Sequence, residues 1–205
     1  QTGTVSLGGV NSLSGSVTAS SGTLLVTNAS SLGSSSTGIT ISSGGALDLQ
    51  NIAIGSIPIT LAGGTLKDAT SSAAGNITLT ANSTLSVTNA ADVFTLSGVI
   101  SESGGSYSIT IAGLGTVVLS GANTYTGGTK INSGTLSVAT GGTSGTNLST
   151  GSVTIGGGSL LLNTNGNTIT NSIVLSAGAD KIASAAGVTA TLSNVISGSG
   201  TGALA

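Results

Sequence analysis

The chain has 205 residues and a net charge of −2 at pH 7, and only 4% of its residues are charged. Three basic residues cannot form the positive surface that neutralises phosphates, so binding to nucleic acid is excluded as an expected function. Gly, Ser and Thr fill half of the sequence, yet 38% hydrophobic residues and a mean hydropathy of +0.50 indicate a chain with a buried core.

Short apolar segments follow one another along the chain, and in each of them every second residue is aliphatic. This period of two, bounded by Gly, Asn and Ser, predicts short β-strands with one buried face. No segment places apolar residues at helical spacing, so essentially no helix is expected. The segments, in chain order, lie at 23–26, 39–41, 46–49, 59–61, 77–79, 84–87, 109–111, 135–138, 153–155, 159–162 and 173–175.

A period near 20 residues links these predicted strands. The leucines at 24, 47, 66 and 85 are 23, 19 and 19 residues apart. Such a period predicts a parallel β-solenoid with two or three strands in each coil, aliphatic side chains stacked inside, and Gly or Asn at the corners. An antiparallel sandwich is the alternative, but it usually has two-residue hairpin turns and more aromatic core residues.

A longer repeat encloses the short one. Residues 3–26 align without a gap with residues 115–138, and 12 of the 24 positions are identical. The segment LSGVIS at 96–101 likewise matches LSNVIS at 192–197. We therefore expect one β-solenoid over residues 1–205, built from two tandem long repeats at about 1–101 and 102–205.

The second copy carries a family pattern. The run LSGANTYTGGT at 119–129, followed by SGTL at 133–136, resembles the passenger-associated strand repeat of bacterial autotransporter proteins. The earlier copy is diverged and has Leu13 where the later one has Tyr125. The resemblance implies an all-β, right-handed parallel β-helix in an extracellular protein or one displayed on the bacterial cell surface, commonly a stalk or an adhesin.

The polar residues give little support for catalysis. The chain has no His, Cys or Arg, which removes the usual general base, thiol nucleophile and phosphate-binding side chain. We therefore expect no catalytic, cofactor or metal site and no enzyme activity. A polysaccharide lyase is the alternative, because Asp48 and Asp68 are about one coil apart. The acidic residues are Asp48, Asp68, Asp92, Glu102 and Asp180.

The few aromatic residues could form a platform for sugars. Tyr107 and Tyr125 would stack on a glycan only if they were exposed. Tyr125 belongs to the family pattern, so we expect it to have a structural place, and we expect Phe94 to fill the core. The asparagines are expected at turns, where their side chains can also form hydrogen-bonded ladders between coils.

The two ends of the chain resemble parts of its interior. The C-terminal segment 192–205 followed by residues 1–9 approximates the internal segment 96–121, and neither end contains a charged residue. Two interpretations remain open: neighbouring repeats of a longer chain continue the solenoid, or separate copies stack head to tail. The residues expected to carry self-association are Thr4, Val5, Leu7, Val195, Ile196 and Leu204.

Taken together, the sequence predicts a structural extracellular β-solenoid that forms a stiff stalk or a head-to-tail fibre at a bacterial cell surface. The alternative is an adhesin or passenger segment that binds host or matrix glycans or proteins. The expected partner is the protein itself or a neighbouring repeat, with a surface glycan as a further possibility. No apolar run approaches the roughly 18 residues that a membrane span needs, so membrane insertion is not expected.

Overall fold

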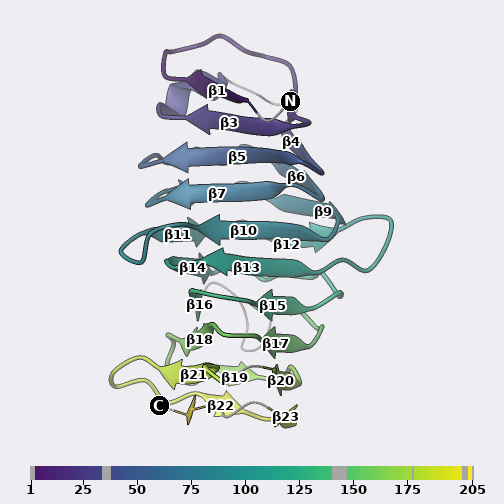
Figure 1. Cartoon of the computed structure of the whole chain (residues 1–205), viewed down its shortest axis with the longest axis vertical. Helices are drawn as coiled ribbons and strands as arrows, with labels where there is room; N and C mark the ends of the chain where they lie inside the picture. Colours follow the sequence, from purple (N-terminus) through teal and green to yellow (C-terminus); the bar gives the residue numbers. More distant parts are fainter. Residues whose placement is uncertain (1–2, 34–37, 140–146, 177, 200–202, 205) are drawn as a thin grey trace.

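The strands of the chain stack in parallel, one coil upon the next. The computed structural model describes residues 3–33, 38–139, 147–176, 178–199 and 203–204. All paired strands among them are parallel, and the sheets run along the long axis with the two termini at opposite poles (Figure 1). The prediction of a parallel β-solenoid is confirmed.

Three long sheets and one short sheet form the faces of the coil. Sheet A contains β1 (Thr4–Leu7), β3 (Gly22–Val26), β5 (Gly45–Gln50), β7 (Thr65–Ala69), β10 (Ser83–Val87), β13 (Ile109–Gly113), β15 (Thr129–Ile131), β17 (Val153–Ile155), β20 (Ile173–Leu175) and β23 (Ile196–Gly198). Sheet B contains β2 (Val17–Ala19), β4 (Ile39–Ser42), β6 (Ile59–Ala62), β9 (Ile77–Ala81) and β12 (Ile100–Glu102).

The third face is sheet C. Its strands are β8 (Ser72–Ala73), β11 (Val93–Leu96), β14 (Thr116–Leu119), β16 (Thr135–Val138), β18 (Ser159–Leu162), β21 (Lys181–Ser184) and β24 (Ala203–Leu204). The chain passes from sheet A to sheet C, then to sheet B, and back to sheet A. The short sheet D, with β19 (Thr168–Ile169) and β22 (Thr191–Leu192), follows sheet C along the chain and so takes the place of sheet B in the last coils.

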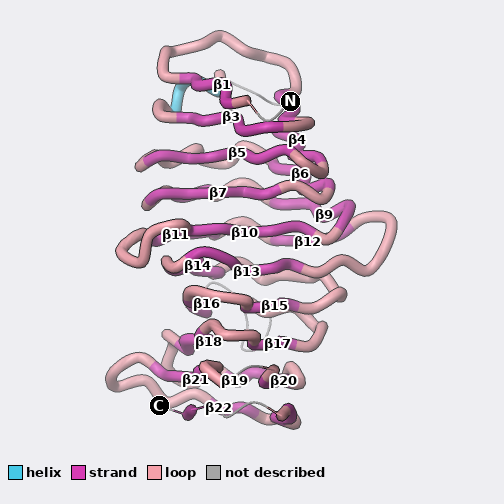
Figure 2. The backbone as a smooth tube through the Cα atoms, viewed as in Figure 1, coloured by secondary structure: helices cyan, strands magenta, loops and turns pink. Residues whose placement is uncertain are grey.

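Helical structure is confined to one short 3-10 turn in the described part of the chain, η1 (Ala29–Leu32), as Figure 2 shows. Asn28 caps this turn, because its side-chain oxygen accepts a hydrogen bond from the Ser30 backbone. The expectation of essentially no helix is therefore confirmed. Among the described residues, no helix is long and apolar enough to cross a membrane.

The core is a set of aliphatic files that run along the axis. Leu24, Leu47, Leu66 and Leu85 are direct neighbours in the register of sheet A, as their spacing predicted. Leu47, Leu66 and Leu85 are fully buried. Each strand thus places alternate side chains in the lumen, and burial of each such side chain contributes about 1.5–3 kcal/mol.

One face of the rod carries sheet B up to β12 and sheet D from β19 onward. In the coils between these two strands, asparagine side chains link the coils in place of strand pairing. Asn123, Asn147 and Asn171 are spaced by 24 residues and are all buried. The side chain of Asn123 donates to the carbonyl of Asn147, and Asn171 donates to the carbonyls of Ser149 and Gly151. This ladder satisfies backbone carbonyls that would otherwise be buried without partners, as the sequence led us to expect.

The two copies of the long repeat occupy different faces. In the first copy β1 and β3 lie in sheet A, whereas the equivalent strands of the second copy, β14 and β16, lie in sheet C. The local pairing is nevertheless the same, because Thr4 pairs with Thr23 as Thr116 pairs with Thr135. The offset between the copies is therefore a whole number of coils plus one face.

Glycines stack at the corner that precedes sheet B. A Cβ atom on Gly75 would lie 1.9 Å from the Ile57 carbonyl oxygen, and one on Gly98 would lie 2.1 Å from that of Gly75. Gly121 repeats the pattern, 2.2 Å from the carbonyl oxygen of Gly98. Successive coils approach so closely at this corner that only a residue without a side chain fits.

We expect Gly98→Ala to lower the free energy of unfolding by about 1–3 kcal/mol, because the added methyl group forces adjacent coils apart. Chemical denaturation followed by circular dichroism measures this change. Gly156→Ala is the matched control, because the nearest neighbour of its added methyl group is the Ser176 hydroxyl at 3.2 Å and not a backbone atom at about 2 Å. Equal stability of the two variants would contradict the close coil contact at Gly98.

Candidate functional site

Within the described residues, the backbone hydrogen-bond ladders end in one outermost coil at each pole. In sheet A, β1 is the terminal strand at one end and β23 the terminal strand at the other. Figure 1 shows these two strands at opposite poles of the rod. An edge strand presents N–H and C=O groups that can pair with another chain, so each end is a candidate interaction surface.

Exposed large apolar side chains gather at these ends. Val5 is 64% exposed in the first coil, where Val10 and Leu13 are also exposed. Val195 is 63% exposed and precedes the exposed Ile196 in the last strand of sheet A. In the described part of the chain, only Val93 and Leu114 are comparable on the sides of the rod. An apolar concentration of this kind makes each end a candidate interaction surface.

The structure places the six residues expected to carry self-association at the two ends. Thr4, Val5 and Leu7 lie in β1 at one pole. At the other pole Val195 precedes β23, Ile196 begins it, and Leu204 lies in β24 at the edge of sheet C. The six residues thus form two surfaces at opposite poles of the rod. Association of one surface with the other surface of a second copy remains a prediction.

Neither end carries the charged residues that commonly protect an edge. The sequence from 3 to 26 and the sequence from 182 to 199 contain no Lys, Asp or Glu. Natural sheets often block edge pairing with charges or with proline. The sequence at both ends therefore has no charge that would oppose pairing with another strand.

The acidic side chains considered for catalysis do not converge. Asp48 and Lys67 are neighbours on the outer side of sheet A, where the Lys67 amine lies 3.3 Å from the Asp48 carboxylate. Asp68 belongs to the next position of the same strand as Lys67 and is only 2% exposed. The two carboxylates thus lie on opposite sides of the sheet. No group of three or more His, Cys, Asp or Glu residues that could hold a metal ion occurs within the described ranges.

Asp68 is a carboxylate in an aliphatic file. Its register neighbours are Leu49 in the preceding coil and Val87 in the following one. One carboxylate oxygen accepts a hydrogen bond from the Ser71 backbone at 2.9 Å, and the other is buried and has no partner among the described residues. Burial raises the pKa of Asp68 above its ordinary value, although the Ser71 hydrogen bonds act in the opposite direction. The alternation after Leu66 was the signal that this side chain points inward.

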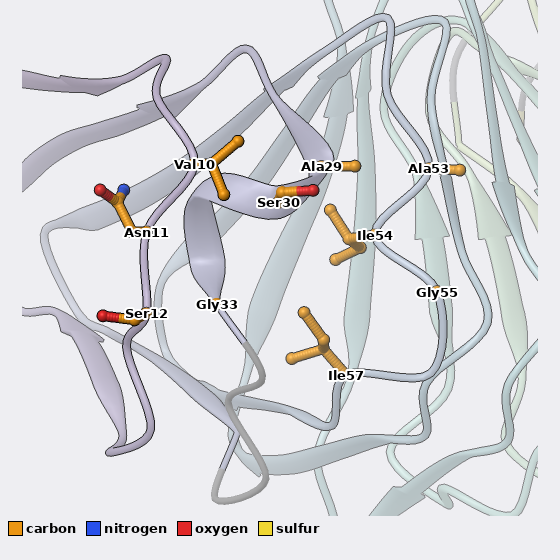
Figure 3. A pocket seen from close by; sticks show the side chains of 10 residues that line it. All are labelled: Val10, Asn11, Ser12, Ala29, Ser30, Gly33, Ala53, Ile54, Gly55 and Ile57. Carbon is orange, nitrogen blue, oxygen red and sulfur yellow. The ribbon is translucent and has the colours of Figure 1, made fainter.

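A hollow of about 570 Å³ opens beside the first coils. Sheet C begins only at β8, so the corresponding face of the earlier coils consists of loops and η1. The side chains of Ile54 and Ile57 extend into the space that faces η1, with Val10 and Ala29 across it (Figure 3). The hollow is mainly apolar, and none of the described residues that line it has a titratable side chain.

Phe94 and Tyr125 take the places that the sequence predicted for them. Phe94 and Tyr125 are fully buried, so neither presents a platform for sugars. The Tyr125 hydroxyl lies 2.6 Å from that of Thr129, and burial raises the pKa of Tyr125 to about 12. Tyr107 is partly buried, and its backbone donates to the Glu102 carboxylate at 2.7 Å.

Comparison with known proteins gives one family match. Residues 1–26 and 109–138 match the model of the passenger-associated-transport-repeat family. The two matched segments contain both copies of the 24-residue repeat, which confirms the resemblance to autotransporter passenger repeats. No curated protein and no solved structure is significantly similar to the chain.

We expect Asp68→Asn to stabilise the fold at pH 7 by roughly 1 kcal/mol, because it removes a buried charge and retains an acceptor for the Ser71 backbone. The folded state holds the Asp68 proton more tightly than the unfolded chain, where the pKa is near 3.8. Acidification from neutral pH through the raised folded value therefore stabilises the unsubstituted chain, and this gain is complete below 3.8.

Denaturation midpoints of both chains between pH 7 and pH 3 measure this effect. Hydrogen bonds from Thr126 and Tyr107 lower the pKa of Glu102 despite its partial desolvation, so Glu102 contributes a change of opposite sign. That contribution is common to both chains and cancels in their difference. A difference that stays constant over this range would contradict the buried, charged state of Asp68.

Proposed function

We propose that this chain is a structural segment of a secreted or surface-exposed bacterial protein, serving as a stiff stalk or as the subunit of a head-to-tail fibre. The observation that carries the proposal is the distribution of exposed apolar side chains. Val5, Val10 and Leu13 lie at one end of the rod, and Val195 and Ile196 lie at the other. A rod with apolar ends and hydroxyl-rich sides associates along its axis.

The interior supports a mechanical role. Hydrogen bonds of the parallel sheets run along the axis, and the aliphatic files are continuous from coil to coil. Bending the rod would stretch ladder hydrogen bonds and open the packed lumen on one side at the same time. The family match supports a location outside the cell, because the passenger of an autotransporter is its exported part.

Val5→Lys tests the axial association. A lysine on the terminal strand adds a charge that must be desolvated when another strand pairs with it, so we expect the variant to remain monomeric. Negative-stain electron microscopy and sedimentation at rising protein concentration measure the assembly. The unsubstituted chain should form filaments or end-to-end oligomers under the same conditions.

Leu114→Lys is the matched control. Leu114 is 68% exposed, close to the value for Val5, but it lies at a corner on the side of the rod. It should therefore assemble like the unsubstituted chain. Compact monomers of the unsubstituted chain at high concentration would rule out the fibre, and loss of assembly in both variants would rule out the ends as its cause.

Adhesion to a glycan is a second candidate function, favoured by the outer side of sheet B. Thr18, Thr40, Thr60 and Thr78 are direct neighbours in its register and form a file of hydroxyls. We expect a glycan-binding segment to lose affinity on Thr40→Val combined with Thr60→Val, which keeps the shape and removes the hydroxyls. Glycan-array binding measures this, and an absence of binding to any glycan would reject adhesion to sugars.

A further inference from the structure

We infer that, in the fibre proposed above, each copy docks on the next with a rotation of one face, so that the junction reproduces an internal contact of the chain. The internal contact joins residues 93–101 to residues 115–126 of the following coil. This inference rests on the proposed function and specifies the partner surface, the register and the rotation. The partner is a second copy of the chain.

The internal contact has a defined pattern of hydrogen bonds. On sheet C, β11 pairs with β14, with Val93 opposite Thr116 and Leu96 opposite Leu119. At the next face the Ile100 N–H donates to the side-chain oxygen of Asn123 at 2.8 Å. The Ile100 carbonyl accepts from the Thr124 backbone at 2.9 Å.

The two ends of the chain carry both halves of this contact. Residues 189–197 are equivalent to 93–101 and share six of nine residues, so Ile196 corresponds to Ile100. Residues 3–14 are equivalent to 115–126 and share six of twelve residues, so Asn11 corresponds to Asn123. The C-terminal end thus matches residues 93–101 of the contact, and the N-terminal end matches residues 115–126.

The polar groups at the ends point as their internal counterparts do. The Ile173 N–H donates to the carbonyl of Val195, as Ile77 donates to Val99, so the Ile196 N–H faces the open end as that of Ile100 faces the next coil. The Asn11 amide donates to the carbonyl of Ser31 in its own next coil at 2.8 Å. In the described part of the chain, the Asn11 side-chain oxygen accepts no hydrogen bond and is available to Ile196 of another copy.

Three glycines at the N-terminal end give an independent indication. Gly115, Gly121 and Gly127 leave no space for a Cβ atom, which would lie within 2.5 Å of the preceding coil. Their equivalents are Gly3, Gly9 and Gly15, around which a Cβ atom would meet no described residue within 4 Å. In the single chain these positions have room for a side chain. Glycine becomes necessary there when another coil covers them as closely as the preceding coil covers Gly115, Gly121 and Gly127.

The exposure of apolar side chains at the N-terminal end also indicates that another coil covers it. Val117 is fully buried beneath Phe94, whereas its equivalent Val5 is 64% exposed. Covering by residues 189–192 of another copy places Ala190 over Val5 and Leu192 over Leu7. The junction thereby buries the exposed valine of β1 in the continuous lumen of the two copies.

The faces of the strands determine the rotation. In the internal contact β11 and β14 share sheet C, but their equivalents differ: residues 191–192 form β22 of sheet D, and β1 lies in sheet A. Since sheet D takes the place of sheet B in the last coils, β1 of the next copy must lie under that face. The second copy is therefore turned by one face, and the third turn restores the original orientation.

Disulfide trapping distinguishes the rotated junction from an unrotated one. The chain has no cysteine, so each pair can be introduced alone. Rotation places Thr4 next to Thr189 of the neighbouring copy, whereas direct stacking of sheet A places Thr4 next to Ser197, since both lie in the outer file of that sheet. Adjacent parallel strands are about 4.8 Å apart, within the range a disulfide spans.

We expect the Thr4→Cys, Thr189→Cys chain to give a ladder of covalent oligomers on oxidation, and the Thr4→Cys, Ser197→Cys chain to give none. Non-reducing gel electrophoresis measures this, with electron microscopy of the same samples. A ladder from the second pair alone, or filaments that neither pair cross-links, would overturn the rotation and leave the fibre intact. Monomers in every sample would overturn the fibre as well and indicate that a longer chain covers the ends.

Gly9→Ala provides a second measurement with a built-in stability control. Its methyl group lies in open space in the single chain, so we expect its thermal unfolding to be unchanged. At the rotated junction the methyl group would meet the backbone of residue 194, as a Cβ on Gly121 would meet Gly98. We expect the concentration needed for assembly to rise about tenfold. Unchanged assembly would contradict the close contact.

Discussion

Each backbone hydrogen bond of the sheets joins one coil to the next, so no coil is complete without the coils above and below it. This constraint explains why half of the residues are Gly, Ser or Thr. The lumen is narrow, and each inward-facing strand position contributes one file of aliphatic side chains to it. The outward-facing positions need only side chains that fit the pleated surface of a strand, and Ser and Thr do so without a charge. The corners must let successive backbones approach closely.

The same constraint explains where polar groups enter the interior. Where strand pairing is lost after β12, the asparagines at 123, 147 and 171 supply the missing donors to backbone carbonyls. Their exact spacing of 24 residues follows from one asparagine per coil. Asp68 lies outside this region, because it occupies a file position between Leu49 and Val87, and one of its oxygens has no hydrogen-bond partner among the described residues.

The features predicted from the sequence depend on the alternation of residues within a strand. The features that were missed depend on which face of the coil each strand occupies. The leucines at 24, 47, 66 and 85 stack as expected, because each lies at the same position of its strand. The different faces of the two repeat copies were not predictable, since the coils of sheet A vary from 19 to 26 residues. The hollow beside η1 was missed for a similar reason, because nothing in the sequence marks the start of sheet C at β8.

The placement of the termini at opposite poles has a consequence for a chain under tension. A pull on the two ends acts along the hydrogen bonds, which join the coils in series, so every coil carries the load and the outermost coils, bonded on one side only, detach first (Figure 1). Each detached coil would release a segment of 19 to 26 residues, or about 65–90 Å of extended chain. The rod would thus lengthen in steps under force while its remaining coils stay intact.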